Sequence, residues 1–357
     1  MTNNVPHPVG PEYVSVRRAP LTAEERSLAL SLPPEVRLGT LGWTSPGYVG
    51  AFYDATSGVK RLFSGGLPEL ARHPLVRVVS LERSYVKPYN EEELRMIAAA
   101  PGPDAPLEFA LRLPARLTDP YLRDAKGRIT APNPDYGDVR TLAKEALDEP
   151  LLILGEHLRV VLLEIGPHSL EDIRGAGYFT SLERALALVA AVAERLPERA
   201  VLGVEWRNVA FLTKRMLEGL HEIGAVPVMS LHPTMPNALR QSRALEYFHS
   251  LFSTVPVDGP AGPFSSAPGE PPLGAPFICR WSLSPSLARP LRSPEMRNAW
   301  VASDPMTRAV IAKWLLRARN AGLPGWVMVG NRAEGRAHDT LVALARAYGV
   351  ERRRTFE

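Results

Sequence analysis

One apolar run of the sequence closes on three polar side chains. The segment "VLGVEWRN" (201–208) begins as a buried strand and ends on Glu205, Arg207 and Asn208. Because side chains alternate between the two faces of a strand, Glu205 and Arg207 project from the same side. Such a pair either lines a functional pocket or is a locally satisfied ion pair, and this segment alone leaves both interpretations open.

The other apolar runs show the same change of character at their C-terminal ends. The polar, charged or aromatic residues found there are Trp43, Glu82, Arg83, Tyr85, Arg112, Glu164, His232, Arg280, Trp281 and Asn331. In a barrel of parallel strands these ends meet at one face, where the connecting loops assemble the active site. The alternative is that the charges pair with one another and only seal the top of the barrel.

The candidate residues suggest binding of an anion. Arg112, Arg207 and Arg280 are permanent cations whose forked guanidinium groups fit a phosphate or a carboxylate. We therefore predict substrate-binding roles for Arg207, Arg112, Arg280, Asn331, Glu82, Tyr85 and Trp43. The aromatic members of this set suit stacking against a sugar or a base, although aromatic side chains are equally common in cores.

Two glutamates and one histidine are the candidates for catalysis. Glu205 and Glu164 suit a general base or a nucleophile, because arginines nearby are expected to keep a carboxylate ionised. His232 ends a strand and is a candidate for catalysis or for metal binding. Three further histidines, His73, His157 and His221, lie in helical patterns and are expected at the surface.

Eight apolar runs must position these residues. The predicted strands are 36–43, 76–85, 107–114, 158–166, 200–208, 225–233, 276–284 and 325–332, and helical patterns are clearest at 91–100, 139–158, 181–196, 306–322 and 339–349. Continuous apolar strands separated by helices indicate parallel βα units, and eight of them predict a single (β/α)8 TIM-like barrel with long βα loops. A doubly wound open sheet is the alternative, but "GTLGWTSPG" (39–47) does not fit the G-x-G-x-x-G turn of that fold.

The rest of the chain is predicted to form an N-terminal arm and two loops that interrupt the alternation of strands and helices. Residues 1–34 are expected to form an irregular N-terminal arm with a short helix, which the capping box of Thr22 and Glu25 begins. The barrel domain is placed at 35–350, with a long loop at 116–138 and a Pro/Gly-rich mobile loop at 253–275.

Composition excludes several classes of protein. The chain has 357 residues, of which 45% are hydrophobic and 22% charged, as in a soluble globular protein. A net charge of +4 weakly favours an anionic partner. It falls short of the clustered basic residues that are expected of a nucleic-acid binder. The single cysteine, Cys279, excludes an internal disulfide and a cysteine-rich metal site. No signal-peptide pattern or membrane-length apolar stretch is found, so a cytoplasmic protein without a membrane partner is expected.

Six segments in sequence order resemble the motifs of the YecE-like family, domain of unknown function 72. They are "RLGTLGWTSPGYVGAFY", "VSLERSYVKPYNEEEL", "FALRLPARLTDPYLRD…GRITAPNP", "GVEWRN", "CRWSLSP" and "VGNRAEG". The resemblance spans roughly residues 36 to 349, and it implies a TIM barrel and no established activity. The positions that fall on recurring residues of the family are Gly42, Trp43, Tyr53, Arg112, Glu205, Arg207, Asn331, Glu334 and Gly335.

Four positions depart from the usual pattern of that family. Glu82 stands where Asn or Asp is usual, Arg112 for Lys, Glu164 for Gln, and Gly330 for Asn. Arginine in place of lysine keeps the charge but removes a titratable amine. The mouth of this barrel is therefore expected to differ in its ligand or its chemistry.

Three functional hypotheses follow. The first is a hydrolase that acts on an anionic sugar or nucleic-acid ligand, with the arginines offsetting charge in the transition state. The second is a metal-dependent phosphoesterase or isomerase, with a divalent ion held by some of Glu82, Glu164, Glu205 and His232. The third is a non-catalytic protein that binds a ligand or nucleic acid at the barrel mouth. The oligomeric state is left open.

Overall fold

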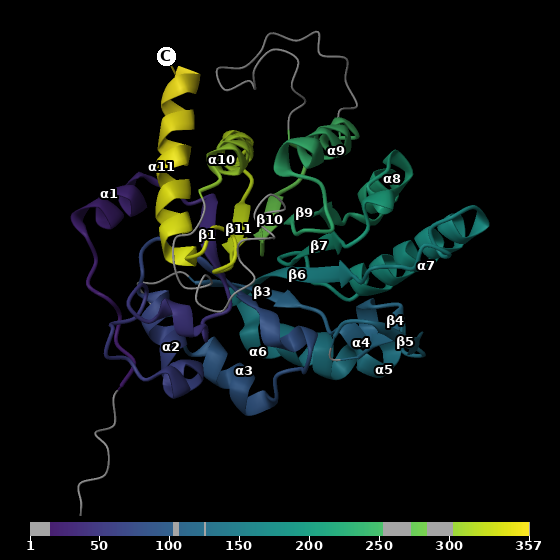
Figure 1. Cartoon of the computed structure of the whole chain (residues 1–357), viewed down its shortest axis with the longest axis horizontal. Coiled ribbons are helices and arrows are strands. Elements are labelled where there is room, and N and C mark those ends of the chain that lie inside the picture. The colour runs from purple at the N-terminus through teal and green to yellow at the C-terminus, as the bar shows by residue number, and fades with distance from the viewer. Residues whose placement is uncertain (1–14, 103–106, 125, 253–272, 284–302, 357) are drawn as a thin grey trace, which may run out of the picture.

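Short parallel strands form a barrel, with helices packed around it (Figure 1). The computed structural model describes residues 15–102, 107–124, 126–252, 273–283 and 303–356. The barrel strands are β1 (Val36–Leu41), β2 (Val78–Leu81), β3 (Glu108–Arg112), β6 (Leu158–Ile165), β7 (Val201–Trp206), β8 (Val226–Pro227), β9 (Met229–Leu231), β10 (Phe277–Trp281) and β11 (Gly325–Val329). Each of the eight predicted apolar runs contains one of these strands, or in one case two, and the prediction of a barrel is confirmed.

One predicted run is split between β8 and β9, and this split closes the barrel. The sheet runs β8-β7-β6-β3-β2-β1-β11-β10-β9, so its two ends are consecutive pieces of a single segment. β8 pairs with β7, whereas β9 pairs with β10. Pro227 has no N–H to donate to a neighbouring strand, which suits the position at which the segment changes its partner.

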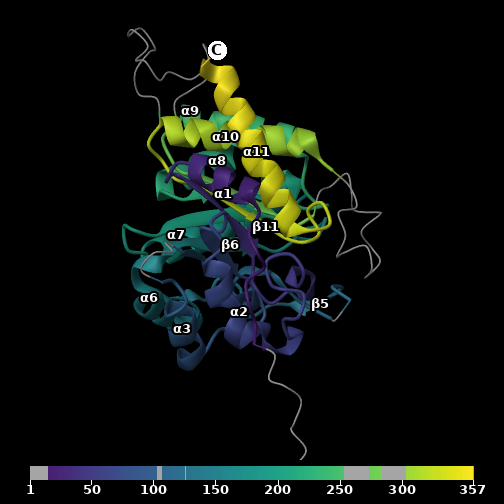
Figure 2. The ribbon, with the colours of Figure 1, turned by 90° about the vertical axis from the view of Figure 1, so that its left-hand side faces the viewer.

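The helices lie outside the strands (Figures 1 and 2). They are α1 (Ala23–Ser31), α2 (Leu62–Ala71), α3 (Glu91–Ala98), α4 (Ala115–Thr118), α5 (Val139–Ala143), α6 (Glu149–Leu154), α7 (Ala176–Ala193), α8 (Lys214–Ile223), α9 (Ala238–Ser250), α10 (Pro305–Asn320) and α11 (Ala337–Phe356). The predicted capping box begins α1, because the Thr22 side chain accepts a hydrogen bond from the backbone N–H of Glu25 at 3.1 Å. Helix α1 lies beside α11 (Figure 2). The ion pair of Glu24 with Arg346 joins the two helices.

The segment 116–138 is more ordered than predicted. In place of a long loop it contains the end of α4 and an antiparallel hairpin of β4 (Tyr121–Arg123) and β5 (Ile129–Pro132). The carboxylate of Asp124 accepts the backbone N–H groups of Lys126 and Arg128, both at 2.9 Å, and closes the turn. The prediction was wrong because strands this short and this exposed bury too little to show an apolar alternation.

The helical pattern at 139–158 is confirmed as helical but is not one helix. A π-helical stretch, Lys144–Asp148, separates α5 from α6, and a 3₁₀ turn, Gly155–His157, leads into β6. Pro150 has no N–H for the hydrogen bond that an uninterrupted α-helix would form there. The π-helical turn before it, which is wider than an α-helical turn, accommodates the missing bond.

Two predicted segments lie partly outside the described ranges. Residues 253–272 of the predicted mobile loop, and residues 1–14 of the arm, lie outside the described residues. Within the part of the chain that the structure does describe, none of the helices has the length and apolar character needed to cross a membrane.

Candidate functional site

Six charged side chains from the ends of five strands meet inside the barrel. They are Glu82, Arg112, Glu164, Glu205, Arg207 and Arg280, and we call them the mouth network. Glu82 directly follows β2 and contacts Arg280 on β10, although β1 and β11 lie between these strands in the sheet. The contact therefore crosses the interior, as expected for residues at the carboxyl ends of barrel strands.

Arg280 is the centre of the mouth network. Its Nη1 lies 2.8 Å from Oε2 of Glu205 and 3.1 Å from Oε2 of Glu164, and its Nε lies 3.2 Å from Oε1 of Glu82. The side chain is only 3% exposed. Burial would lower the pKa of this guanidinium, but the three carboxylates raise it well above its ordinary value. One buried cation thus holds all three glutamates together.

Arg207 joins Glu164 and Glu205 on the other side. Its Nη2 lies 2.6 Å from Glu164, and its Nη1 lies 2.9 Å from Glu205 and 3.0 Å from the hydroxyl of Ser230. The Ser230 hydroxyl donates to Oε1 of Glu205 at 2.6 Å. Gln241 on α9 fixes Ser230 by accepting from its N–H at 2.9 Å and donating to its carbonyl at 2.8 Å.

The sequence analysis did not predict a role for Ser230 or Gln241. Ser230 carries a usable signal, because it is a polar residue inside an apolar run and lies two positions before His232, on the same side of the strand. Gln241 carries none, since a glutamine on a helix is ordinarily solvated. Its role comes from the packing of α9 against β9.

Glu82, Arg112 and Tyr85 form the solvent-accessible edge of the mouth network. The side chains of Glu82 and Arg112 are 25% and 12% exposed, against 7% or less for the other four charged groups. Nη1 of Arg112 lies 3.3 Å from Glu82, and its guanidinium carbon lies 3.5 Å from the centre of the Tyr85 ring. The buried Nε of Arg112 has no hydrogen-bond partner among the described residues. A ligand reaching the mouth network would meet these residues first.

The charges of the mouth network compensate one another. Burial by itself would raise the pKa of Glu82, but the guanidinium groups of Arg280 and Arg112 outweigh it and lower this pKa. The same competition, with Arg207 as a third cation, lowers the pKa of Glu164. Three guanidinium groups therefore face three glutamate side chains, and the ion pair of Glu205 with Arg207 is part of this larger set.

His232 lies next to the mouth network and is half-buried. Its Nδ1 is 2.9 Å from the hydroxyl of Thr234. Burial, with the positive charge of Arg207, lowers its pKa to about 4, so the ring is neutral at pH 7. A neutral imidazole can bind a metal or accept a hydrogen bond, but this pKa makes it a weak general base. Its catalytic role stays a prediction.

Trp43 lines a cavity that adjoins the mouth network. The indole is buried, donates to the carbonyl of Phe63 at 3.1 Å and stacks on the rings of Phe63 and Tyr89. The cavity measures about 230 Å³ and is lined by Leu41, Gly42, Trp43, Thr44, Ser45, Phe63, Glu82, Arg83 and Tyr89. Glu82 belongs both to this cavity and to the mouth network, and so connects an aromatic recess to the buried charges.

Asn331 lies outside the mouth network and has local partners. Its side-chain oxygen accepts from the N–H of Ala337, the first residue of α11, at 3.0 Å. Its amide nitrogen donates to the hydroxyl of Ser45 at 2.9 Å, which ties the loop after β11 to the loop after β1. These contacts position two loops of the mouth, and a ligand-binding role for Asn331 stays a prediction.

Buried histidines make the stability of the fold depend on pH. Burial lowers the pKa of His168 to about 4, of His232 to about 4 and of His249 to about 3, whereas an unfolded histidine titrates near pH 6.5. Below pH 6.5 the unfolded chain thus binds protons that the folded chain does not, so stability falls as the pH falls. The lowered pKa values of Glu82 and Glu164 extend this loss further into acid.

We expect the free energy of unfolding to drop between pH 6.5 and about pH 4 by roughly 1.4 kcal/mol per pH unit for each of these histidines. Urea unfolding at a series of pH values measures this slope. The variant His249→Asn should have a shallower slope, and a free energy that is constant over this range would contradict the prediction.

The comparisons with known proteins agree with this fold. The family model described as "Protein of unknown function DUF72" matches residues 37–356. A DUF72 family protein from Thermotoga maritima MSB8, solved at 2.20 Å, superposes with a TM-score of 0.52 at 16% identity, covering 90% of this chain and 99% of that one. A DUF72 family protein from Enterococcus faecalis V583, solved at 3.10 Å, gives 0.51 at 15% identity, covering 88% and 95%.

At these identities the solved structures are evidence for the fold alone. No protein with a curated description matches the chain. The family match covers most of the sequence, and the resemblance seen in the six motifs is confirmed. This chain belongs to the DUF72 family of proteins of unknown function, with the TIM-like barrel of its structural relatives.

Proposed function

We propose that the barrel mouth binds a small anionic ligand, bearing a phosphate or a carboxylate, and that the protein acts on it as a hydrolase. The observation that supports binding is the position of Glu82. Its carboxylate bridges the guanidinium groups of Arg112 and Arg280 at the open edge of the mouth network. A ligand carboxylate or phosphate forms the same kind of bridge between two arginines.

Glu82 in this proposal takes the place of the ligand's anionic group. It is the most exposed of the six charged residues and lies in the 3₁₀ turn that follows β2. Its side chain is therefore the one that can most easily move away from the arginines. When it leaves, two guanidinium groups lose a partner, and an incoming anion restores the charge balance. Binding therefore exchanges one carboxylate for another anion and adds no unpaired charge to the interior.

The cavity beside Glu82 favours a small ligand with a ring. Trp43, Phe63 and Tyr89 line this cavity, and aromatic side chains suit contact with a sugar or a base. Its volume of about 230 Å³ is below the usual range of pockets for drug-sized molecules, so a phosphorylated or carboxylated sugar fits the proposal better than a nucleic-acid chain.

The hydrolytic part of the proposal rests on Glu164 and Glu205. Arg112, Arg207 and Arg280 lower the pKa of Glu164, so this carboxylate stays ionised and suits a nucleophile better than a general acid. Glu205 accepts hydrogen bonds from Arg280 and from Ser230. Arg207 and Arg280 would offset negative charge that develops as the ligand is cleaved.

A divalent ion at the mouth is less well supported. Each of the three glutamates there is bonded to two or more arginine nitrogens, and an ion would have to displace these cations. A non-catalytic binding protein would bind the same anionic ligand at the mouth but would not hydrolyse it. Whether a bound sugar is hydrolysed distinguishes a binding protein from a hydrolase.

Replacing Glu82 tests the exchange of anions. Glu82→Ala should bind phosphorylated and carboxylated sugars about 10–100-fold more tightly than the natural protein, because two charge-assisted hydrogen bonds become available to the ligand. Arg112→Ala should lose this binding. Calorimetric titration of a panel of such sugars, preceded by a thermal-shift screen, measures both effects.

Glu91→Ala is the matched control, since it removes a carboxylate from an exposed arginine pair on α3 and should leave anion affinity unchanged. If Glu82→Ala binds no anion more tightly, the proposed binding mode is wrong. If a sugar binds but is not hydrolysed, and Glu205→Gln changes nothing, the hydrolase part is wrong and the protein is a binding protein.

A further inference from the structure

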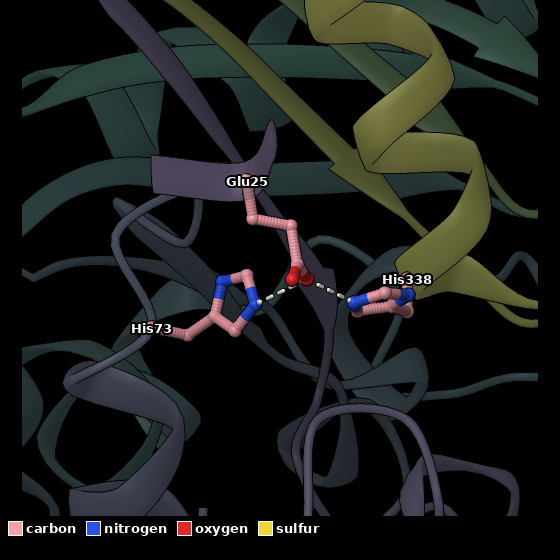
Figure 3. A group of neighbouring side chains, drawn as sticks. All are labelled: Glu25, His73 and His338. Carbon is pink, nitrogen blue, oxygen red and sulfur yellow. Dashed lines mark hydrogen bonds and ion pairs between the residues drawn. The ribbon is translucent and has the colours of Figure 1, made fainter. Parts of the chain in front are cut away.

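A second cluster of charged and titratable side chains lies outside the barrel. Glu25 comes from α1, His73 follows the end of α2, and His338 lies in the first turn of α11 (Figure 3). Oε1 of Glu25 is 3.4 Å from Nε2 of His73 and 2.6 Å from Nε2 of His338. One ligand atom from each residue thus lies within 4.8 Å of the other two.

The capping box of α1 orients the carboxylate of this cluster. Oε2 of Glu25 accepts hydrogen bonds from the backbone N–H and from the hydroxyl of Thr22, both at 2.6 Å. Oε1 is consequently the atom that faces the two imidazoles (Figure 3). A motif recognised in the sequence as a helix start therefore also aims a ligand atom.

Asp339 orients His338 in a similar way. Its Oδ1 lies 3.0 Å from Nδ1 of His338, and its Oδ2 lies 3.5 Å from Nε of Arg336. A carboxylate on the far nitrogen of a histidine fixes the ring and makes the near nitrogen a better metal ligand. This contact is typical of the supporting residues around metal sites.

His73 supplies the second imidazole from the protein interior. It was expected on a helix surface, and that prediction is wrong: it lies just beyond α2 with its side chain only 2% exposed, against the ring of Phe52. The His338 side chain is 18% exposed and gives the cluster access to solvent.

We propose that Glu25, His73 and His338 form a zinc site with three protein ligands and water as the fourth. Tetrahedral Zn²⁺ with bonds of about 2.0–2.1 Å places its ligand atoms about 3.3–3.4 Å apart. The separation of Glu25 from His73, 3.4 Å, already has this value. The 2.6 Å contact between Glu25 and His338 is a hydrogen bond that must lengthen when the ion replaces its proton.

The site differs from the barrel mouth in place and in role. Its three ligands come from segments far apart in the sequence, so the ion would fasten α1 and the start of α11 to the segment after α2. Glu25 also lies before residues 37–356, so one ligand stands outside the match to the family model. The proposal is independent of the function proposed for the mouth.

Titration of the full chain with Zn²⁺ alone tests the site. We expect one equivalent to bind, and the unfolding temperature to rise on binding and fall again when a chelator is added. Glu25→Gln and His338→Gln, which keep side-chain size, should abolish this equivalent. Asp339→Asn acts only through His338 and should weaken affinity about 10–100-fold.

His232→Gln is the matched control, because it removes a half-buried histidine at the barrel mouth and should retain one equivalent of zinc. Visible absorption of the Co²⁺-loaded chain is a readout that does not depend on stability. It should show a tetrahedral nitrogen and oxygen site without thiolate bands, and should be lost in His338→Gln. Absence of a 1:1 complex, or full binding by Glu25→Gln and His338→Gln, would overturn the proposal.

Discussion

Arg280→Met is expected to lower the free energy of unfolding by about 3–5 kcal/mol. Arg280 contacts all three glutamates of the mouth network and is 3% exposed, so its loss leaves three carboxylates facing two arginines in the barrel interior. Methionine fills similar space without charge, and the loss therefore reports on electrostatics more than on packing. Urea unfolding at pH 7 measures it.

Two further variants separate this effect from a general loss of ion pairs. Arg95→Ala breaks a pair with Glu91 whose side chains are 69% and 64% exposed, and it should cost less than about 1 kcal/mol. Adding Glu82→Gln to Arg280→Met makes the mouth network neutral again, so the double variant should recover part of the loss. If Arg280→Met is as stable as the natural protein, the buried charges do not depend on one another as described.

Gly39→Ala is expected to cost more than about 3 kcal/mol or to prevent folding. Gly39 lies on β1 opposite Val78 of β2, and a Cβ atom there would stand 1.6 Å from the carbonyl oxygen of Val78. Because the obstacle is backbone, no rotation of a side chain relieves it, and the two strands must separate. Soluble yield, near-ultraviolet circular dichroism and urea unfolding measure the outcome.

Gly65→Ala is the matched control for this substitution. Gly65 lies in α2, and a Cβ atom there would meet its nearest neighbour, a methyl carbon of Val16, at an ordinary 3.4 Å. Alanine in a helix should stabilise the protein by about 0.5–1 kcal/mol relative to glycine. A stable, well-folded Gly39→Ala variant would show that β1 and β2 are not as close as the structure has them.

The sequence by itself determined the strands, most of the helices and the fold. Parallel strands in a barrel are buried on both faces, so they appear as continuous apolar runs such as 158–166, and the helices between them keep their own periodicity. The strand ends were also predictable, because the change from apolar to charged residues at Glu205 and Arg207 is local information. The capping box of Thr22 and Glu25 could be identified for the same reason.

Short or irregular elements were not predictable. The hairpin of β4 and β5 buries too few side chains to give a pattern, and the split between β8 and β9 depends on which neighbour each half meets. The burial of His73 was missed as well, since α1 and α11 cover it from distant parts of the chain. Nothing in the residues around position 73 indicates that cover.

Only the tertiary structure decided which charges face each other. Glu82 and Arg280 are 198 positions apart, and Glu25 and His338 are 313 apart. Partners this distant are set by barrel closure and strand register, which no local pattern contains. The sequence placed three arginines and three glutamates at one mouth, and their mutual compensation, with Glu82 at the open edge, follows from side-chain geometry that exists only once the barrel has closed.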